Sequence, residues 1–258
     1  DKDKYTVGLK AAQVNKSIRI NLLDSLKLDY DKWSVDTTNY ILYDSTGLIV
    51  HNFAINKEGQ LLQINSKEEN ANAPVDLTLK DFRIKTLTNL AEQDSLLADG
   101  TINGTAEVRE MMTNPVFTAD LNLDNITYNT DTVGNIAIKV NNQTANVFDA
   151  DVAITGNEND IRLTGKYFTG EGKMDLLLAV NNFNMAVLKA VSNGAVTSSA
   201  GSLKGKVDIK GTTSQPDING NLSFVNTDIT PAATGEKLHL SDESIVVVSS
   251  QGIRFNQF

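Results

Sequence analysis

Apolar and polar residues alternate strictly along residues 201–211. The odd positions hold Gly, Leu, Gly, Val, Ile and Gly, whereas the even positions hold Ser, Lys, Lys, Asp and Lys. Because successive side chains of a β-strand point to opposite faces of the sheet, this stretch predicts a strand with one apolar face and one water-facing face. A break at residues 212–215 and a second alternating stretch, residues 216–224, predict that two such strands form a hairpin.

The same pattern occurs 101 positions earlier in the chain, where residues 100–108 and 115–123 match residues 201–209 and 216–224 without a gap. The pairs Phe82/Phe183 and Gly134/Gly235 extend the match on both sides, which indicates an internal repeat. We therefore divide the chain into four parts of one continuous elongated domain. These are the end of a preceding repeat (1–35), two repeat units (36–136 and 137–237) and the start of a third (238–258).

Two stretches have the three- and four-residue apolar spacing of an amphipathic helix instead. The first contains Leu87, Leu90, Ala91, Asp94 and Leu97, and the second contains Met185, Leu188 and Val191 and ends at Asn193 and Gly194. Shorter alternating stretches before residue 67 predict strands, and we expect the only tryptophan, Trp33, to be a packing anchor. The expected fold is mainly β, an elongated, twisted and curved sheet of repeated units with short helices.

Composition limits the possible functions. The chain has 258 residues, a net charge of −9 and no cysteine. The acidic balance without a basic cluster argues against nucleic acid, and the absence of cysteine excludes disulfides and thiolate metal sites. No apolar run is long enough to span a bilayer. Because the chain opens on Asp1 without a methionine, we interpret it as a fragment whose targeting segment, if present, lies outside it.

The sequence contains no convincing catalytic or metal-binding motif, so we expect neither an enzyme nor a cofactor. His51 and His239 lie within alternating strands and outside any motif, which favours structural roles. Residues 120–124 place oxygen-bearing side chains at alternate positions, as a calcium loop does. The intervening Leu121 and Leu123, and the absence of the loop's glycine and distal glutamate, favour the wet face of a strand.

Glycines at positions 201, 205, 211 and 220 fall on the apolar face of the hairpin. A sandwich core would favour valine or isoleucine there, because glycine weakens a strand and fills no volume. We therefore interpret this face as concave.

The glycine-punctuated series resembles a known family. The order is Gly-x-Leu-x-Gly-x-Val-x-Ile-x-Gly, four residues, Pro-x-Ile-x-Gly-x-Leu-x-Phe, then residues 238–245 and 252–255. This order resembles the C-terminal repeats of TamB-like proteins in the AsmA-like superfamily. The first copy departs from the pattern, since Glu110 and Ala119 replace two of its glycines. The high content of Asn and Asp and the style of the repeat resemble those of family members from Bacteroidota.

The resemblance implies a taco-shaped sheet with an apolar groove, an open structure similar to a β-solenoid. It also implies a periplasmic protein of a Gram-negative bacterium, held in the inner membrane by an N-terminal anchor that this fragment lacks. The implied partners are phospholipid acyl chains and an outer-membrane barrel protein of the BamA or TamA type. The implied function is to shield phospholipid between the two membranes and to support outer-membrane protein assembly. The residues expected to line the groove are Ile102, Ala106, Val108, Phe117, Leu121, Leu123, Leu203, Val207, Ile209, Ile218, Leu222 and Phe224.

Two other classes of function remain open on the sequence. One is an extracellular β-repeat adhesin or carbohydrate-binding module, although exposed aromatic platforms for sugars are scarce here. The other is a purely structural spacer, in which the apolar face would meet only protein.

Overall fold

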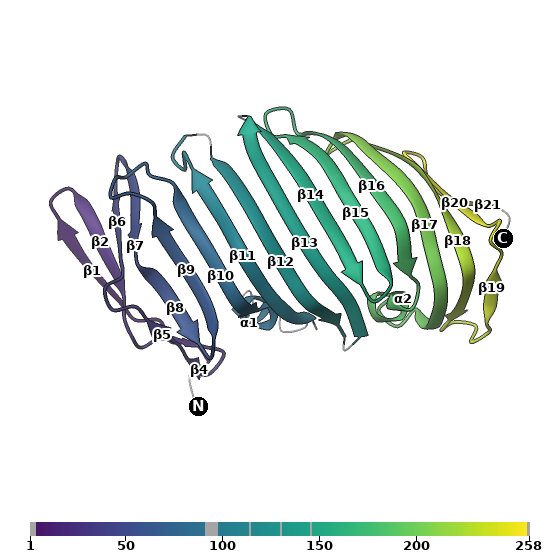
Figure 1. Cartoon of the computed structure of the whole chain (residues 1–258), viewed down its shortest axis with the longest axis horizontal. Coiled ribbons are helices and arrows are strands. Elements are labelled where there is room, and N and C mark those ends of the chain that lie inside the picture. Colours follow the sequence, from purple (N-terminus) through teal and green to yellow (C-terminus); the bar gives the residue numbers. More distant parts are fainter. Residues whose placement is uncertain (1–3, 91–97, 114, 130, 145, 257–258) are drawn as a thin grey trace. The chain divides into compact units, whose positions relative to one another are not determined.

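The computed structural model describes residues 4–90, 98–113, 115–129, 131–144 and 146–256 (Figure 1). The chain divides into two compact units, Asp1–Leu123 and Asp124–Phe258. Most described residues are in antiparallel strands, and the described part of the chain contains two short helices. The largest sheet has 15 strands, and its hydrogen-bonding order runs from β5 to β21 without closing into a barrel. The prediction of a mainly β, open and twisted sheet is therefore confirmed.

The described part of the first unit contains a four-stranded sheet, the two-stranded sheet β3-β4, the first strands of the large sheet and one helix. The four-stranded sheet has the order β1-β2-β6-β7, while β5, β8, β9, β10, β11 and β12 follow one another in the large sheet. The elements are β1 (Leu9–Val14), β2 (Ser17–Leu22), β3 (Lys27–Leu28), β4 (Asp31–Lys32), β5 (Ser34–Val35), β6 (Tyr40–Asp44), β7 (Gly47–His51), β8 (Phe53–Lys57), β9 (Gln60–Ser66), β10 (Val75–Arg83), α1 (Ile84–Leu90), β11 (Ala98–Arg109) and β12 (Val116–Tyr128), the last of which crosses the unit boundary.

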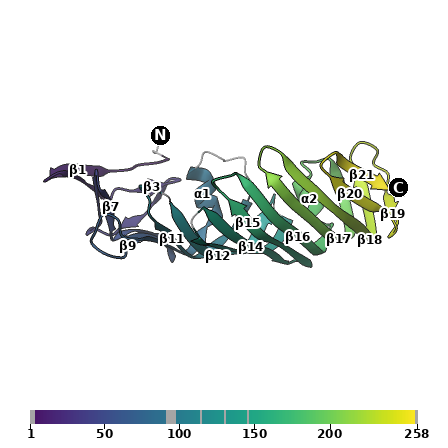
Figure 2. The same cartoon turned by 90° about the horizontal axis from the view of Figure 1, so that it is seen from above.

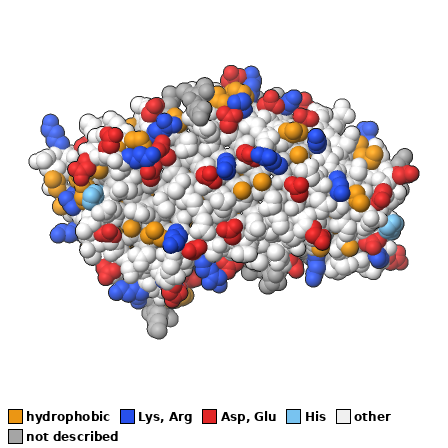
Figure 3. Space-filling model, in the orientation of Figure 1, with side chains coloured by type: hydrophobic (Ala, Val, Ile, Leu, Met, Phe, Trp, Pro, Cys, Tyr) orange, Lys and Arg blue, Asp and Glu red, His pale blue; other side chains and the backbone are white. Residues whose placement is uncertain are grey.

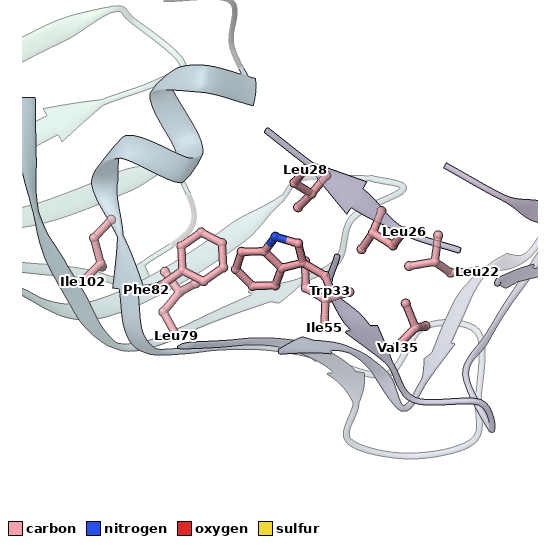
Figure 4. Close-up of a cluster of buried hydrophobic side chains, with 9 residues drawn as sticks. All are labelled: Leu22, Leu26, Leu28, Trp33, Val35, Ile55, Leu79, Phe82 and Ile102. Carbon is pink, nitrogen blue, oxygen red and sulfur yellow. The ribbon is translucent and has the colours of Figure 1, made fainter. Parts of the chain in front are cut away.

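A closed hydrophobic core lies in the first unit, between the large sheet and the N-terminal segments (Figure 4). In Figure 2, β3 and α1 lie on one side of β9 and β11. Trp33 is only 1% exposed, and its ring centroid lies 5.6 Å from that of Phe82, which is fully buried. Leu22, Leu26 and Ile55 belong to the same cluster. The prediction that Trp33 is a packing anchor is therefore confirmed.

The second unit continues the meander with long strands. Its elements are β13 (Asp131–Thr144), β14 (Val147–Gly156), β15 (Asn159–Phe168), β16 (Lys173–Asn184), α2 (Val187–Val191), β17 (Val196–Thr212), β18 (Pro216–Pro231), β19 (Leu238–Leu240), β20 (Ile245–Ser249) and β21 (Gly252–Asn256). β17 and β18 form the predicted hairpin, with its turn at residues 212–215.

Local geometry also repeats at the offset of 101 residues. The pairing of β10 with β11 shifts register between Leu79 and Phe82, and the pairing of β16 with β17 shifts between Val180 and Phe183. A short helix follows each of these irregularities. The second predicted helix is therefore confirmed. The first begins as predicted, but its expected continuation through residues 91–97 lies outside the described residues. The proposed boundaries of the repeat units remain a prediction.

Candidate functional site: an apolar sheet face in the second unit

Three rows of aliphatic residues and glycines cross the sheet of the second unit. Directly opposed residues of paired strands lie on the same face, so the strand registers define each row. The first row is Val140, Ala150, Gly165, Leu176, Ile209 and Ile218; the second is Ile138, Val152, Leu163, Leu178, Val207, Gly220 and Val248; the third is Ile136, Ile154, Ile161, Val180, Gly205, Leu222 and Val246. We call these three rows the apolar face. It contains no polar side chain.

The opposite face of the same strands is mainly polar, although it also carries a few apolar side chains such as Leu177 and Ala179. Arg162 forms a two-bond ion pair with Asp151 on the neighbouring strand, with 2.8 Å between Nε and Oδ1. This pairing holds the pKa of Asp151 below its ordinary value, chiefly through the hydrogen bonds from Arg162. Lys166 and Asp149 form a second cross-strand pair at 2.6 Å. Figure 3 shows charged side chains of both signs interspersed along these strands, which is typical of a surface that faces water.

Among the described residues, protein covers one end of the apolar face. Met185, Phe224 and Val246 are buried in a cluster there, together with partly buried neighbours such as Phe183 and Leu188. The helix α2, which follows Met185, packs against both β13 and β17 at this end. Over the rest of the face, the described residues provide no second layer, and side chains such as those in the middle of the second row are only partly buried. The second unit therefore presents an apolar sheet surface that its own described residues leave largely uncovered.

The glycines on this face have a backbone role. Gly205 has a φ of +152°, and a Cβ there would lie 2.0 Å from the carbonyl oxygen of Asn221 on β18. At Gly220, a Cβ would lie 2.3 Å from the carbonyl oxygen of Lys206 and 2.9 Å from Cγ2 of Val207. Glycine is thus required because the strands approach too closely for any side chain. The sequence predicts a concave face from these glycines, and the structure supplies a different physical reason for them, the close approach of the strands.

The segment that carries most of this face is also similar to a known protein family. Residues 151–255 match the family model of the TamB C-terminal domain. The match confirms the resemblance to TamB-like proteins over this segment. The comparison with curated proteins and the comparison with solved structures each gave no match. The TamB family is an envelope-associated transport and assembly module.

Six of the expected groove residues lie in the TamB-like segment. Four of them, Val207, Ile209, Ile218 and Leu222, belong to the rows of the apolar face. The other two, Leu203 and Phe224, oppose each other across the hairpin and pack in the covered cluster. The structure therefore brings these six residues onto one face of one hairpin.

The other six expected residues lie in the first unit, where protein covers part of the same strand face. Ile102 is buried in the core around Trp33, and Leu121 and Leu123 pack against that core. Ala106 and Val108 oppose Leu77 and Val75 on β10 and are partly buried, whereas Phe117 is 39% exposed.

The predicted lining residues include four of the 20 residues in the rows of the apolar face. The prediction named only β17 and β18 in the second unit, although β13 to β16 contribute residues such as Val152, Leu163 and Leu178. The alternation of apolar and polar positions is present in those strands too. Extending the hairpin's pattern to every strand of the repeat would have found them.

The two histidines make structural contacts. His51 stacks on Tyr40 with 4.6 Å between ring centroids, and Nδ1 of His239 lies 2.9 Å from Oδ1 of Asp228. Within the described ranges, no group of His, Cys, Asp and Glu side chains is arranged to hold a metal ion. The described helices are too short to cross a membrane.

Proposed function

We propose that the apolar face binds phospholipid acyl chains and that the protein is part of a lipid conduit. One observation carries this proposal: three continuous apolar rows lie on strands whose other face is mainly polar, and the described residues form a second protein layer at one end only. Large uncovered apolar surfaces in soluble proteins mark binding sites for apolar partners. The match of residues 151–255 to the TamB C-terminal domain supports a transport partner over a purely structural one.

The dimensions of the face suit an acyl chain. Each row crosses neighbouring strands about 4.8 Å apart, so the second row, from β13 to β20, is about 29 Å long. Half the hydrocarbon thickness of a bilayer, which one acyl chain spans, is about 15 Å. Successive rows are about 7 Å apart along the strands, so the three rows are wide enough to cover one chain.

The energetics favour a continuous surface over a tight pocket. Burying one methylene contributes roughly 0.8 kcal/mol, so a 16-carbon chain that crosses water unprotected loses about 12 kcal/mol. A face without polar interruptions removes most of this barrier at every position along its length. The acyl chain can then slide along the face, because no position has a deep free-energy minimum that would trap it.

We further infer the setting from the family. TamB-like proteins are envelope-associated, so we propose a periplasmic location in a Gram-negative bacterium and an inner-membrane anchor in the full-length protein. The proposed protein partner is an outer-membrane barrel of the BamA or TamA type, and the proposed process is outer-membrane protein assembly. The support for these points is the family match alone.

Photo-crosslinking tests the acyl-chain proposal. A photoreactive amino acid at Ile218, which is partly buried on the apolar face, is expected to capture phospholipid in cells, as detected by mass spectrometry. The neighbouring Asn219 is exposed on the opposite face and is the matched control. If Ile218 captures no lipid, or captures no more than Asn219, the proposal is wrong and the spacer interpretation gains support. Val207 is a poorer probe position because it is only 5% exposed.

A further inference from the structure

A second candidate binding site lies in the first unit, away from the apolar face. It is a cavity of about 350 Å³ between α1 and the turns of the N-terminal segments. Leu28 and Trp33 form its apolar part, Gln60 and Asn89 contribute amides, and charged residues surround them. This volume is at the lower end of the range for small-molecule sites.

Two buried hydrogen-bond donors line this cavity without a partner. Trp33 is 1% exposed, and its indole N–H has no acceptor among the described residues; Figure 4 shows the indole nitrogen pointing toward the space between α1 and Leu28. Gln60 is 9% exposed, and its side-chain oxygen accepts a 3.0 Å bond from the backbone N–H of Arg83. Its amide N–H₂ has no partner in the described part of the chain.

Trp33 and Gln60 both line the cavity, and their side-chain N–H groups are not fully enclosed by protein. Asn142 is the described residue whose side-chain polar atoms are fully enclosed without a partner, and neither Trp33 nor Gln60 is in that condition. Within a cavity of this size these N–H groups have no protein acceptor among the described residues, and the oxygen atom of a ligand would supply one. The two donors therefore favour a ligand with an oxyanion or carbonyl group.

Two turns and one irregularity within a strand bring carboxylates to the same cavity. Asp29 lies in the β3–β4 turn with a φ of 52°, Glu58 lies in the β8–β9 turn with a φ of 50°, and Asp81 lies at the irregularity in β10 with a φ of 46°. Asp31 also lines the cavity but is paired with Lys57. The Asp81 carboxylate has no cationic partner among the described residues, so it is available to an ammonium group.

We propose that this cavity binds a small zwitterion. Its oxyanion would accept hydrogen bonds from Trp33 and Gln60, and its ammonium group would face the carboxylates of Asp29 and Asp81. The lining contains four acidic and three basic side chains, which suits a molecule carrying both charges better than a simple anion or cation. A free solute and an ethanolamine phospholipid headgroup share this chemistry. The inference does not depend on acyl-chain binding in the second unit.

The fluorescence of Trp33 provides the test, because it is the only tryptophan in the chain. The purified protein is titrated with phosphoethanolamine, with inorganic phosphate and ethanolamine separately, and with dihexanoyl phosphatidylethanolamine below its micelle concentration. We expect a saturable change with phosphoethanolamine and at least tenfold weaker binding of each half alone. A response to the short-chain lipid but not to phosphoethanolamine supports the site and identifies its source as a lipid headgroup.

Substitutions locate the site. Asp81→Asn keeps a residue that tolerates the left-handed backbone and is expected to weaken binding at least fivefold. Glu243→Gln, an exposed position in the second unit, removes the same charge and should leave binding unchanged. Trp33→Phe should also weaken binding, which is measured by calorimetry because this variant lacks the fluorophore. Its thermal unfolding midpoint reports the effect of the substitution on folding. The proposal is overturned if neither zwitterion binds, if phosphate alone binds as tightly, or if Asp81→Asn matches the parent protein.

Discussion

Replacing Ile209 with arginine should block lipid passage along the apolar face without unfolding the second unit. Ile209 lies between Leu176 and Ile218 in the first row and is only partly buried, so an arginine stem can stay on the sheet with its guanidinium in water. The substitution interrupts about one strand spacing, 4.8 Å, of an acyl chain about 15 Å long, which corresponds to about four methylenes. At about 0.8 kcal/mol each, the loss is about 3 kcal/mol, or about a hundredfold in affinity.

The assay is transfer of a fluorescent phospholipid between donor and acceptor vesicles by the purified protein. Asn219→Arg introduces the same charge on the opposite face, beside Asp208, and is the matched control. We expect Ile209→Arg to reduce transfer strongly and Asn219→Arg to leave it unchanged, with both proteins showing similar urea unfolding midpoints. Equal transfer by the parent protein and Ile209→Arg would refute the reasoning and indicate that the face does not carry lipid.

Three further predictions concern stability. Gly205→Ala should destabilise the second unit by about 1–3 kcal/mol in urea unfolding, because φ is +152° and the strands touch, whereas Gly170→Ala, which meets open space, should be neutral. Trp33→Ala should lower the free energy of unfolding by about 3–5 kcal/mol, because it leaves a cavity in the hydrophobic core of the first unit. It should therefore speed hydrogen exchange in residues 4–90 more than in residues 146–256. The hydroxyl of Thr46, followed by that of Ser17, lowers the pKa of Asp44 to about 2 from 3.8. Because the folded pKa is the lower one, this stabilisation is present above about pH 4 and is lost as pH falls toward 2. Urea midpoints of Asp44→Asn should therefore fall less over that range than those of the parent protein.

Strand alternation in the sequence was sufficient to predict the β17–β18 hairpin and the face that each residue occupies. Alternation is a local property, and each strand pairs with the next one along the chain, so the register of neighbours needed little long-range information. The reason for glycine at position 205 could not be predicted in this way. It depends on a carbonyl oxygen of the partner strand, 16 residues further along the chain, and on a backbone conformation that periodicity does not report.

The cavity in the first unit was also beyond the reach of sequence patterns. Trp33 and Gln60 lie on separate segments, and the carboxylates come from turns and an irregularity that each look like ordinary polar loop residues. Turn chemistry explains why Asp29 and Asp81 tolerate a positive φ, because aspartate is among the residues that adopt this conformation most readily. It does not predict that the turns converge. Only the packing of α1 and the N-terminal strands over the sheet brings them together.

Phe82 and Phe183 show why an apolar strand face does not by itself specify a ligand. They occupy equivalent positions in the repeat, each beside the same irregularity in strand pairing. Phe82 packs under Trp33 in a closed core, whereas Phe183 packs beside Met185 at the covered end of a face that the described residues otherwise leave uncovered. The alternating pattern therefore determines which side of a strand avoids water, but it does not determine what covers that side. In the first unit other protein segments cover it, and in the second we propose that an acyl chain does.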